Sequence, residues 1–394
     1  MTAALTRAIP LRLAAGATAI LMAWSVGGCT AVADPPDQQS PTAQSSTATA
    51  PAFASVLEKY SDKLHDAGAP VVIIQMKSRL GEWSKAVGVR SLENREPVQL
   101  ADQVHIGDIT MSMVAVSVMK LVEEGKVRLD DPITKYLPEF ENLIHPPGPV
   151  TVRSLLSHRS GMPGYWEALV RAGDAGDRSM SHEQRLAAAA TLHWKPQGPG
   201  GVFNYSNTNY SALALLVEKL RGRDIGEVLH ADIAQPLGLE DTQMTGDQPG
   251  PAKMVHGYIL SKNGERLETT LSPFHTGSAD TGMISTVPDL NTFFAALQQG
   301  KVLQSKTLAE MTTSNHEEYG LGLMKRYDPC SNNFYFGHVG VVLGYGTLAL
   351  VSADGSRQLA IAVARPPSPE LVGFDDRGAF EMVDVALKAL NMAC

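Results

Sequence analysis

The spacing of apolar residues predicts helices and strands in the first third of the chain. Apolar side chains recur every three to four positions over residues 54–67, which predicts an amphipathic helix. Residues 71–76 form a β-branched apolar run that predicts a buried strand, and residues 82–89 are expected to be its hairpin partner. Residues 108–124 predict a helix with few polar positions that ends at Gly125, and so apolar a helix is normally buried within a domain.

The pattern then changes from helical in the middle of the chain to short strands near its end. Helices are expected over residues 151–157, 208–220 and 285–297. Glycine-punctuated apolar segments follow, which predict consecutive antiparallel strands. These strands are expected at residues 320–325, 334–336, 346–351 and 358–363, with a last helix at 380–390. An α+β fold follows, with an antiparallel sheet built from both chain ends beside a mostly helical region.

The first 28 residues have the pattern of an export signal. Arg7 and Arg12 are their charged residues, and residues 13–26 are almost entirely apolar but short for a transmembrane helix. Two glycines precede Cys29, which resembles the bacterial lipoprotein signal, in which the cysteine is lipidated and becomes the new N-terminus. We expect residues 1–28 to be the signal peptide and Cys29 to anchor an extracytoplasmic envelope protein to the membrane. An ordinary cleaved signal with an incidental cysteine is the alternative.

Composition narrows the possible classes of protein. Residues 29–52 are rich in Ala, Pro, Ser, Thr and Gln without apolar periodicity, which predicts a flexible tether before a folded domain at 53–394. The net charge of −8 argues against a nucleic-acid partner held by a global basic field. An acidic protein is not attracted to anionic lipid headgroups, so acyl chains would have to supply its affinity for the membrane.

The cysteines and histidines suggest a disulfide but no metal site. Outside the cytoplasm Cys330 and Cys394 can oxidise, so we expect a disulfide between them, with two separately buried thiols as the alternative. There is no His-Glu-x-x-His, no Cys-x-x-Cys and no Walker-type loop, and the histidines are scattered. We therefore expect neither a metal nor another cofactor.

Four short segments, in a fixed order along the chain, contain the residues that point to a chemical function. They are Val-His-Ile-Gly-Asp-Ile-Thr-Met at 104–111, Leu-Leu-Ser-His-Arg-Ser-Gly-Met-Pro at 155–163, Phe-Asn-Tyr-Ser-Asn at 203–207 and Gly-His-Val-Gly at 337–340. Together they resemble the serine β-lactamase and penicillin-binding protein family, in the branch of class C β-lactamases, D-alanyl-D-alanine carboxypeptidases and esterases. The resemblance spans about residues 54–390 and implies a β-lactamase/transpeptidase-like fold.

In that family a serine at the N-terminal end of a buried helix attacks an acyl carbon, and a lysine one helical turn later helps to take up its proton. The matching positions here are Asp108 and Met111, which offer neither a hydroxyl nor an amine. A carboxylate nucleophile would form an anhydride rather than a stable ester. We expect Asp108 to be a helix N-cap and Met111 an apolar filler.

Two other hydroxyls of the same helix are poor substitutes. Ser117-Val118-Met119-Lys120 matches the S-x-x-K pattern literally. However, Ser117 lies roughly 13.5 Å further along the helix than Asp108 and on its opposite side. Thr110 is two residues from Asp108 and therefore faces another side of the helix.

The remaining motifs are retained in part. The resemblance gives Tyr205 the position of the remaining base, and gives Asn207, His338 and Gly340 ligand-binding positions. Val339 replaces the threonine of the last motif, which removes a hydroxyl that would help to hold a substrate carboxylate. The alternatives are that Tyr205 and Asn207 merely cap the next helix and that His338 is structural.

Three functions are compatible with these residues. We expect a non-acylating homologue that binds a peptidoglycan stem peptide, a β-lactam-like molecule or another acyl ligand. The alternative is an active serine hydrolase, a β-lactamase, D,D-carboxypeptidase or esterase, with a non-standard nucleophile. The third is a scaffold whose groove is filled and whose surface binds an envelope partner.

Overall fold

Six antiparallel strands from both ends of the chain form the main sheet, in the order β2-β1-β11-β10-β9-β8. The computed structural model describes residues 50–172, 179–195, 202–246, 251–261, 263–313, 318–367 and 376–394. The strands are β1 (Val71–Ser78), β2 (Gly81–Gly88), β8 (Met324–Asp328), β9 (Asn333–Val342), β10 (Tyr345–Ser352) and β11 (Gln358–Ala364). The register of β1 on β11 sets Val71 opposite Ala364. The predicted α+β fold with a sheet built from both chain ends is confirmed.

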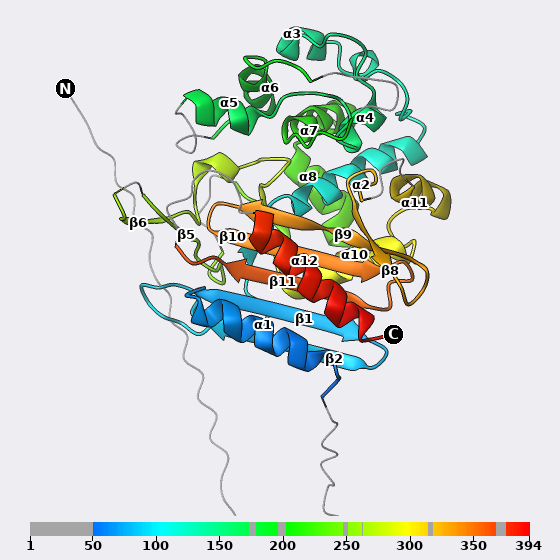
Figure 1. Cartoon of the computed structure of the whole chain (residues 1–394). Coiled ribbons are helices and arrows are strands. Elements are labelled where there is room, and N and C mark those ends of the chain that lie inside the picture. Colours follow the sequence, from blue (N-terminus) through cyan, green and yellow to red (C-terminus); the bar gives the residue numbers. More distant parts are fainter. Residues whose placement is uncertain are drawn as a thin grey trace, which may run out of the picture. The chain divides into compact units, whose positions relative to one another are not determined.

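Helices cover both faces of this sheet, which explains why its central strands are so apolar. α1 (Ala54–Asp66) and α12 (Asp376–Asn391) lie on one face, and α10 (Val287–Gln298) lies on the other (Figure 1). The β1 segment Val-Val-Ile-Ile at 71–74 is fully buried, as expected for a strand packed on both faces.

The middle of the chain is mostly helical, as predicted. Its longest helices are α2 (Ile109–Glu123) and α7 (Thr208–Arg221), which pack against each other and are buried along most of their lengths. The shorter helices are α3 (Phe140–Ile144), α4 (Val152–Leu156), α5 (Tyr165–Ala172), α6 (His182–Ala189), α8 (Ile225–Leu229), α9 (Gln235–Leu237) and α11 (Ser305–Thr312). Single helical turns are η1 (Ile133–Lys135), η2 (His230–Ala234) and η3 (Pro273–His275).

Two small sheets accompany the helices, and the sequence pattern did not predict them. One has the strand order β3 (Val104–His105), β7 (Met283–Ser285) and β4 (Gln243–Met244). The other is the hairpin of β5 (Tyr258–Leu260) and β6 (Arg266–Glu268). Strands this short carry too few residues for an alternating pattern to be detected.

Two predicted elements are displaced in the structure. The strand expected at residues 320–325 begins only at Met324, because the preceding residues pack against α2 instead of pairing in the sheet. A Cβ on Gly322 would lie 2.3 Å from the Ala115 Cβ of that helix. The helix expected from residue 285 begins at Val287, where the Thr286 side chain caps it by accepting from the Asp289 N–H at 3.2 Å.

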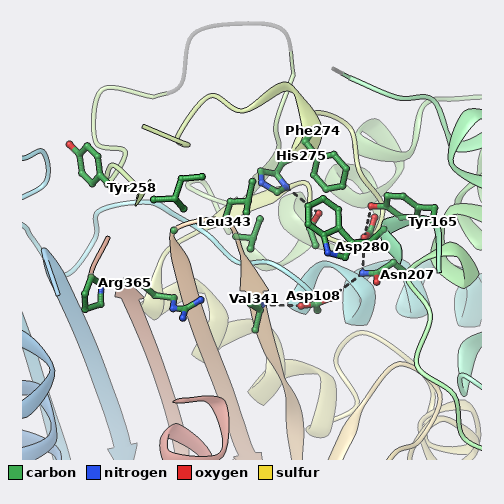
Figure 2. A pocket seen from close by; sticks show the side chains of 16 residues that line it. Asp108, Tyr165, Asn207, Tyr258, Phe274, His275, Asp280, Val341, Leu343 and Arg365 are labelled. Carbon is green, nitrogen blue, oxygen red and sulfur yellow. Dashed lines mark hydrogen bonds between the residues drawn. The ribbon is translucent and has the colours of Figure 1, made fainter. Parts of the chain in front are cut away.

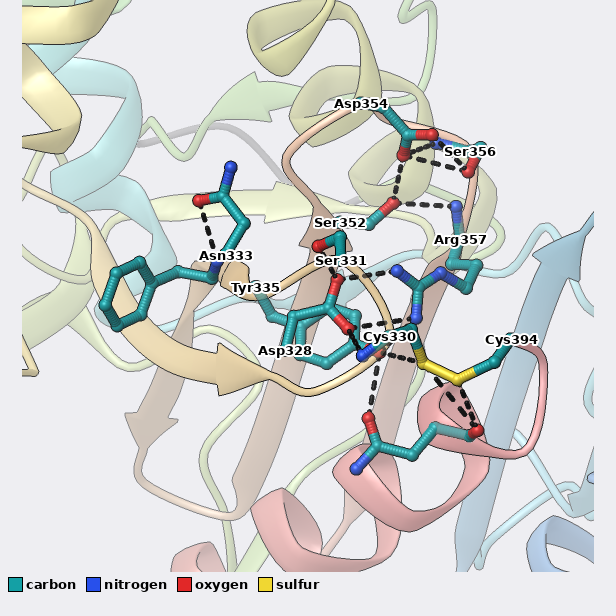
Figure 3. A network of polar contacts seen from close by, with 12 residues as sticks. Asp328, Cys330, Ser331, Asn333, Tyr335, Ser352, Asp354, Ser356, Arg357 and Cys394 are labelled. Carbon is teal, nitrogen blue, oxygen red and sulfur yellow. Dashed lines mark hydrogen bonds and ion pairs between the residues drawn. A yellow bond between two sulfur atoms is a disulfide. The ribbon is translucent and has the colours of Figure 1, made fainter.

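A disulfide joins Cys330, between β8 and β9, to Cys394 at the end of the chain, with Cα atoms 5.5 Å apart (Figure 3). Beside it lies a buried ion pair in which Arg357, just before β11, donates to Asp328, at the end of β8, at 2.6 Å. The Tyr335 hydroxyl bonds both the Arg357 guanidinium and the Asn391 side chain of α12. Covalent and polar contacts therefore fasten the chain end to the β8–β9 edge of the sheet.

The predicted signal peptide at 1–28, Cys29 and the tether up to residue 49 lie outside the described residues. Among the helices that the structure describes, none is long and apolar enough to cross a membrane.

Candidate functional site

Two glycines bring the start of α2 against strand β9. Gly107 has φ +53°, and a Cβ there would lie 2.4 Å from the Val341 nitrogen. A Cβ on Gly340 would lie 1.8 Å from the carbonyl oxygen of Ile106. Thr347 of β10 holds the same carbonyl with a 2.8 Å hydrogen bond. Asp108 is therefore placed beside Val341 by a backbone approach that only glycine permits.

Asp108 points toward β9 and the loop before α7, not along its own helix. Its Oδ2 accepts the Val341 N–H at 2.9 Å. Its Oδ1 accepts the Tyr205 hydroxyl and, at 3.4 Å, the Asn207 amide. Asp108 occupies the N-cap position of α2, but its side chain makes no capping hydrogen bond. The expectation that Asp108 acts as an N-cap is therefore wrong, because donors across the site hold the carboxylate instead.

Burial raises the pKa of Asp108 to about 7. The hydrogen bonds from Tyr205 and Val341 act in the opposite direction, because they stabilise the carboxylate, and the nearby Asp280 charge adds to the increase. The side chain is 9% exposed, so solvent does little to stabilise its charge. Asp108 is therefore poised to change its protonation state near neutral pH.

Met111 lies one turn along α2 from Asp108 and is fully buried. Its Sδ is 3.6 Å from the Tyr205 hydroxyl. A thioether carries no proton and is at most a weak acceptor, so this position supplies no base. Met111 fills the space beside Tyr205, as expected of an apolar filler.

Tyr205 presents an exposed ring and an enclosed hydroxyl. The side chain is 42% exposed, while its ring packs against His158 with centroids 4.4 Å apart. Burial and the Asp108 carboxylate hold the pKa of Tyr205 well above its usual value. The hydroxyl therefore stays protonated and donates to Asp108, which is the opposite of what a general base does.

Asn207 links Asp108 to a second buried carboxylate, Asp280. The Asn207 amide donates to Asp280 Oδ2 at 2.9 Å, and the Tyr165 hydroxyl donates to the same oxygen at 2.8 Å. Ser278 donates to the other oxygen of Asp280. Asp280 therefore accepts hydrogen bonds from three side-chain donors.

The Gly-His-Val-Gly segment runs along β9. His338 is 5% exposed, and its Nε2 lies 3.0 Å from the Tyr319 hydroxyl. Burial lowers the pKa of His338 to about 4, so the ring is neutral at physiological pH. Gly340 contributes a close backbone approach, and Val339 offers no hydroxyl. The segment at residues 337–340 therefore lacks both a cation and a hydroxyl with which to hold a carboxylate.

The alternative hydroxyls are turned away from this site. Ser117 is fully buried, and its Oγ has no hydrogen-bond partner among the described residues. Thr110 accepts the Met283 N–H at 3.3 Å, on the side of the small β3-β7-β4 sheet. Ser206 donates to the Pro163 carbonyl at 3.2 Å. Each of these hydroxyls is held by the fold or enclosed in the core.

Asp108 lies between two cavities. The first has a volume of about 250 Å³ and combines acids with aromatic walls (Figure 2). Its lining includes Asp108, Tyr165, Trp166, Asn207, Tyr258, Phe274, His275, Asp280, Val341, Leu343 and Arg365. The second, about 370 Å³, is lined by Asp108 and Val341 together with His338 and Phe380. Of the six positions singled out from the motifs, Asp108, Tyr205, Asn207 and His338 line one or both cavities, whereas Met111 and Gly340 line neither.

Several lining residues lie outside the sequence motifs. Tyr165, Trp166, Phe274, His275 and Asp280 carry no recognisable motif of their own. The sequence signal that could have located Asp280 is its position directly before the Gly-Met-Ile-Ser-Thr stretch at 282–286. That stretch pairs with β3 just before Gly107, which explains how Asp280 comes close to Asp108.

A separate exposed cluster contains potential metal-ligand atoms. The side chains of Glu93, His256 and Glu268 bring one such atom each within 4.8 Å of the others. His256 pairs with Glu268 at 2.8 Å, and Arg266 pairs with Glu93 at 2.9 Å. Neighbouring side chains thus already compensate these acids.

Comparisons with known proteins agree with this architecture. The sequence matches the Beta-lactamase family over residues 53–383. It is 27% identical over 305 residues to esterase EstB of Burkholderia gladioli, covering 68% of this chain and 75% of the esterase. It is also 27% identical to the D-alanyl-D-alanine-carboxypeptidase/endopeptidase AmpH of Escherichia coli K12, covering 61% of each chain, so it spans less than two thirds of that relative.

Solved structures of other proteins have the same fold. A D-stereospecific amidohydrolase from Streptomyces sp. aligns with a TM-score of 0.69 and 30% identity, over 79% of this chain and 94% of that one. The D-amino acid amidase of Ochrobactrum anthropi SV3, complexed with D-phenylalanine, aligns with a TM-score of 0.72 over 87% of this chain and 99% of the amidase. At 22% identity the latter supports the fold alone. With more than three quarters of its length matched, the chain belongs to the beta-lactamase family.

Proposed function

We propose that this chain is a non-acylating member of the beta-lactamase family that binds a small acyl or peptide ligand in the cavity beside Asp108. The observation that carries the proposal is the Asp108 carboxylate itself. It stands at the position of the family's nucleophile and accepts hydrogen bonds from Val341 and Tyr205.

Acyl transfer requires a nucleophile and a group that removes its proton. Asp108 offers a carboxylate whose oxygens are already engaged, and Met111 has no basic atom. The Tyr205 hydroxyl donates a proton toward Asp108 and remains protonated, so it does not act as the base. These three positions therefore lack the pair of groups that the covalent mechanism needs.

The relatives suggest the chemical class of the ligand. Their names include an esterase, a D-alanyl-D-alanine carboxypeptidase/endopeptidase and a D-stereospecific amidohydrolase. Within the proposal, a D-amino-acid amide or peptide, such as a peptidoglycan stem peptide, or a β-lactam-like molecule is the ligand. The cavity of about 250 Å³ beside Asp108 favours a binding protein over a scaffold whose groove is filled.

The proposal includes export and a lipid anchor at Cys29, on the sequence pattern of residues 1–29 alone. Such an anchor would hold the binding domain at the outer side of the cell membrane, where peptidoglycan precursors and β-lactams are encountered.

Fluorescent penicillin separates this proposal from an active hydrolase with an unforeseen nucleophile. Purified protein is incubated with the probe, boiled in denaturant and analysed by gel fluorescence, with a penicillin-reactive serine enzyme as the positive control. The proposal predicts no covalent label. A band that survives boiling would overturn it in favour of the active hydrolase.

A further inference from the structure

At the Asp108 end of the 250 Å³ cavity, the side-chain donors are already used. Asn207 donates from the same amide nitrogen to Asp108 Oδ1 at 3.4 Å and to Asp280 Oδ2 at 2.9 Å. Both amide hydrogens are then engaged, so its remaining polar atom is a carbonyl oxygen. The Tyr165 hydroxyl is likewise donated to Asp280, at 2.8 Å. What this end of the cavity still presents to a ligand is oxygen acceptors on two acids and an amide.

A chain of hydroxyls makes His275 a further acceptor. Ser278 donates its hydroxyl hydrogen to Asp280. Thr281 donates to Ser278 at 3.5 Å, so the Thr281 oxygen accepts from His275 Nδ1, also at 3.5 Å. This network assigns the proton of the neutral ring to Nδ1 and leaves a lone pair on Nε2.

The His275 Nε2 atom has no protein partner that would use this lone pair. His275 is 3% exposed and lines the cavity (Figure 2). Its Nε2 has no hydrogen-bond partner among the described residues. A buried acceptor normally has a partner, so this atom points to a ligand that carries hydrogen-bond donors.

The remaining walls are aromatic. Trp166 and Phe274 pack edge to face, with centroids 4.8 Å apart, and Tyr165 and Tyr258 also line the cavity. Such faces bury an apolar group and attract an adjacent cation through their ring quadrupoles. The wall composition therefore suits a cation on a hydrophobic body.

The groups that would favour an anion at this end are missing or occupied. The Val341 N–H is taken by Asp108, and His338 is neutral. Arg185 is fully buried behind the Tyr165 ring, where its guanidinium donates to the Phe274 carbonyl at 3.2 Å. Arg365 also lines the cavity, from the segment that follows β11, but it already has an interaction partner (Figure 2). The cavity beside Asp108 therefore presents acceptors and negative charge, whereas the family resemblance implies a site whose donors hold a carboxylate.

We propose that this cavity binds a primary ammonium group carried on an apolar, ring-sized body, with Asp108 and Asp280 supplying the negative charge and His275 Nε2 an additional acceptor. This inference rests on the proposed function, because it names the ligand class of the same non-acylating site.

Two probes of one shape and opposite charge test it. Isothermal titration at pH 8 compares 2-phenylethylammonium with 3-phenylpropionate on the full-length protein. The amine should bind at least about tenfold more tightly than the acid, as expected for a charge-assisted contact. Asp108→Asn keeps the size of the side chain and removes its charge, so it should abolish most of this preference.

Asp289→Asn is the matched control. Asp289 also lies in the first turn of a helix, at the start of α10, but it bonds Thr242 outside the cavity. Its loss should leave the preference for the amine unchanged, and thermal unfolding checks that both variants are folded.

Each outcome is decisive for one proposal. Equal or stronger binding of the acid, binding of neither probe, or an unchanged preference in folded Asp108→Asn protein would overturn the ammonium site. Covalent labelling by penicillin would instead overturn the non-acylating function. The two failures are therefore distinguishable.

Discussion

The backbone N–H of Val341 donates a hydrogen bond to Oδ2 of Asp108 across 2.9 Å, and so joins β9 to the start of α2. In the family chemistry, backbone N–H groups near the nucleophile and on this strand stabilise an oxyanion. Here a carboxylate oxygen of the protein takes one of these donors. The Val341 N–H is therefore not free to donate to the carbonyl oxygen of an acyl ligand.

Restoring the nucleophile and its lysine should restore acylation. We expect the double variant Asp108→Ser with Met111→Lys to acquire a fluorescent penicillin label that survives boiling, because the cavity beside these positions is open. The single variant Asp108→Ser should label about a hundredfold more slowly, because it has no amine to remove the proton. A folded double variant that takes no label would show that the surrounding pocket, not the two substitutions, prevents acylation.

The raised pKa of Asp108 makes its contribution to stability depend on pH. The folded protein holds this proton more tightly than the unfolded chain, since the pKa rises from 3.8 to about 7. The stabilisation is complete below about pH 4 and is lost as the pH rises through 7. The stability of wild type relative to Asp108→Asn should therefore fall by about 2–4 kcal/mol between pH 4 and pH 8.

Urea unfolding of both proteins at several pH values measures this difference. His158 and His338, whose pKa values burial lowers to about 3 and about 4, lose their stabilising effect as the pH falls. Both histidines are present in both proteins, so their effects cancel in the comparison. A stability difference that does not change with pH would contradict the assignment.

Removing the disulfide should destabilise the fold without changing the cavity. Cys330 and Cys394 are 64 residues apart, so Cys330→Ser with Cys394→Ser should lower the free energy of unfolding by about 2–4 kcal/mol. A reductant should lower the melting temperature of wild type and leave that of the variant unchanged. If the reductant has no effect on wild type, the bond does not contribute to stability.

Gly340→Ala should disturb the contact between Asp108 and Val341. The new methyl group would meet the Ile106 carbonyl oxygen at 1.8 Å, so β9 and the segment before α2 must separate. We expect a loss of at least about 2 kcal/mol in stability together with weaker binding of the amine probe. Gly164→Ala is the control, because a Cβ at that position meets no atom within 4 Å. Equal stability of the two variants would contradict the close approach.

The proposed lipid anchor at Cys29 can be tested in cells. Cys29→Ala should move the protein from the detergent-rich phase to the aqueous phase of a Triton X-114 extraction, because the acyl chains supply the membrane affinity. Cys330→Ser, which leaves the proposed lipidation position intact, should remain in the detergent phase. A wild-type protein found in the aqueous phase would refute the anchor.

Much of the fold could be predicted from the local sequence, because the central strands and the longest helices have clear patterns of apolar residues. The β-branched run at 71–74 and the apolar helix around residue 115 were recognisable for this reason. The prediction of a strand at 320–325 was wrong over its first residues, because Gly322 packs against α2. The spacing of apolar residues does not encode such a tertiary contact.

The candidate site was predicted only where motifs marked it. Asp108 and Met111 were found by alignment with a known pattern, but Asp280 and His275 come to the same cavity through the packing of loops distant in sequence. The capping role expected of Asp108 was wrong for a related reason. Local preference favours an N-cap, whereas the actual partners of the carboxylate, Val341 and Tyr205, lie far along the chain.

The intact mass of the purified protein after prolonged incubation with a β-lactam shows whether a protein with Asp108 and Met111 at these positions can be acylated. The Asp108→Ser, Met111→Lys variant serves as the comparator under the same conditions. We expect an unchanged mass for wild type and an added mass of one acyl group for the double variant. A wild-type mass increased by one β-lactam, located by peptide mapping to a residue of this cavity, would contradict the proposed non-acylating function.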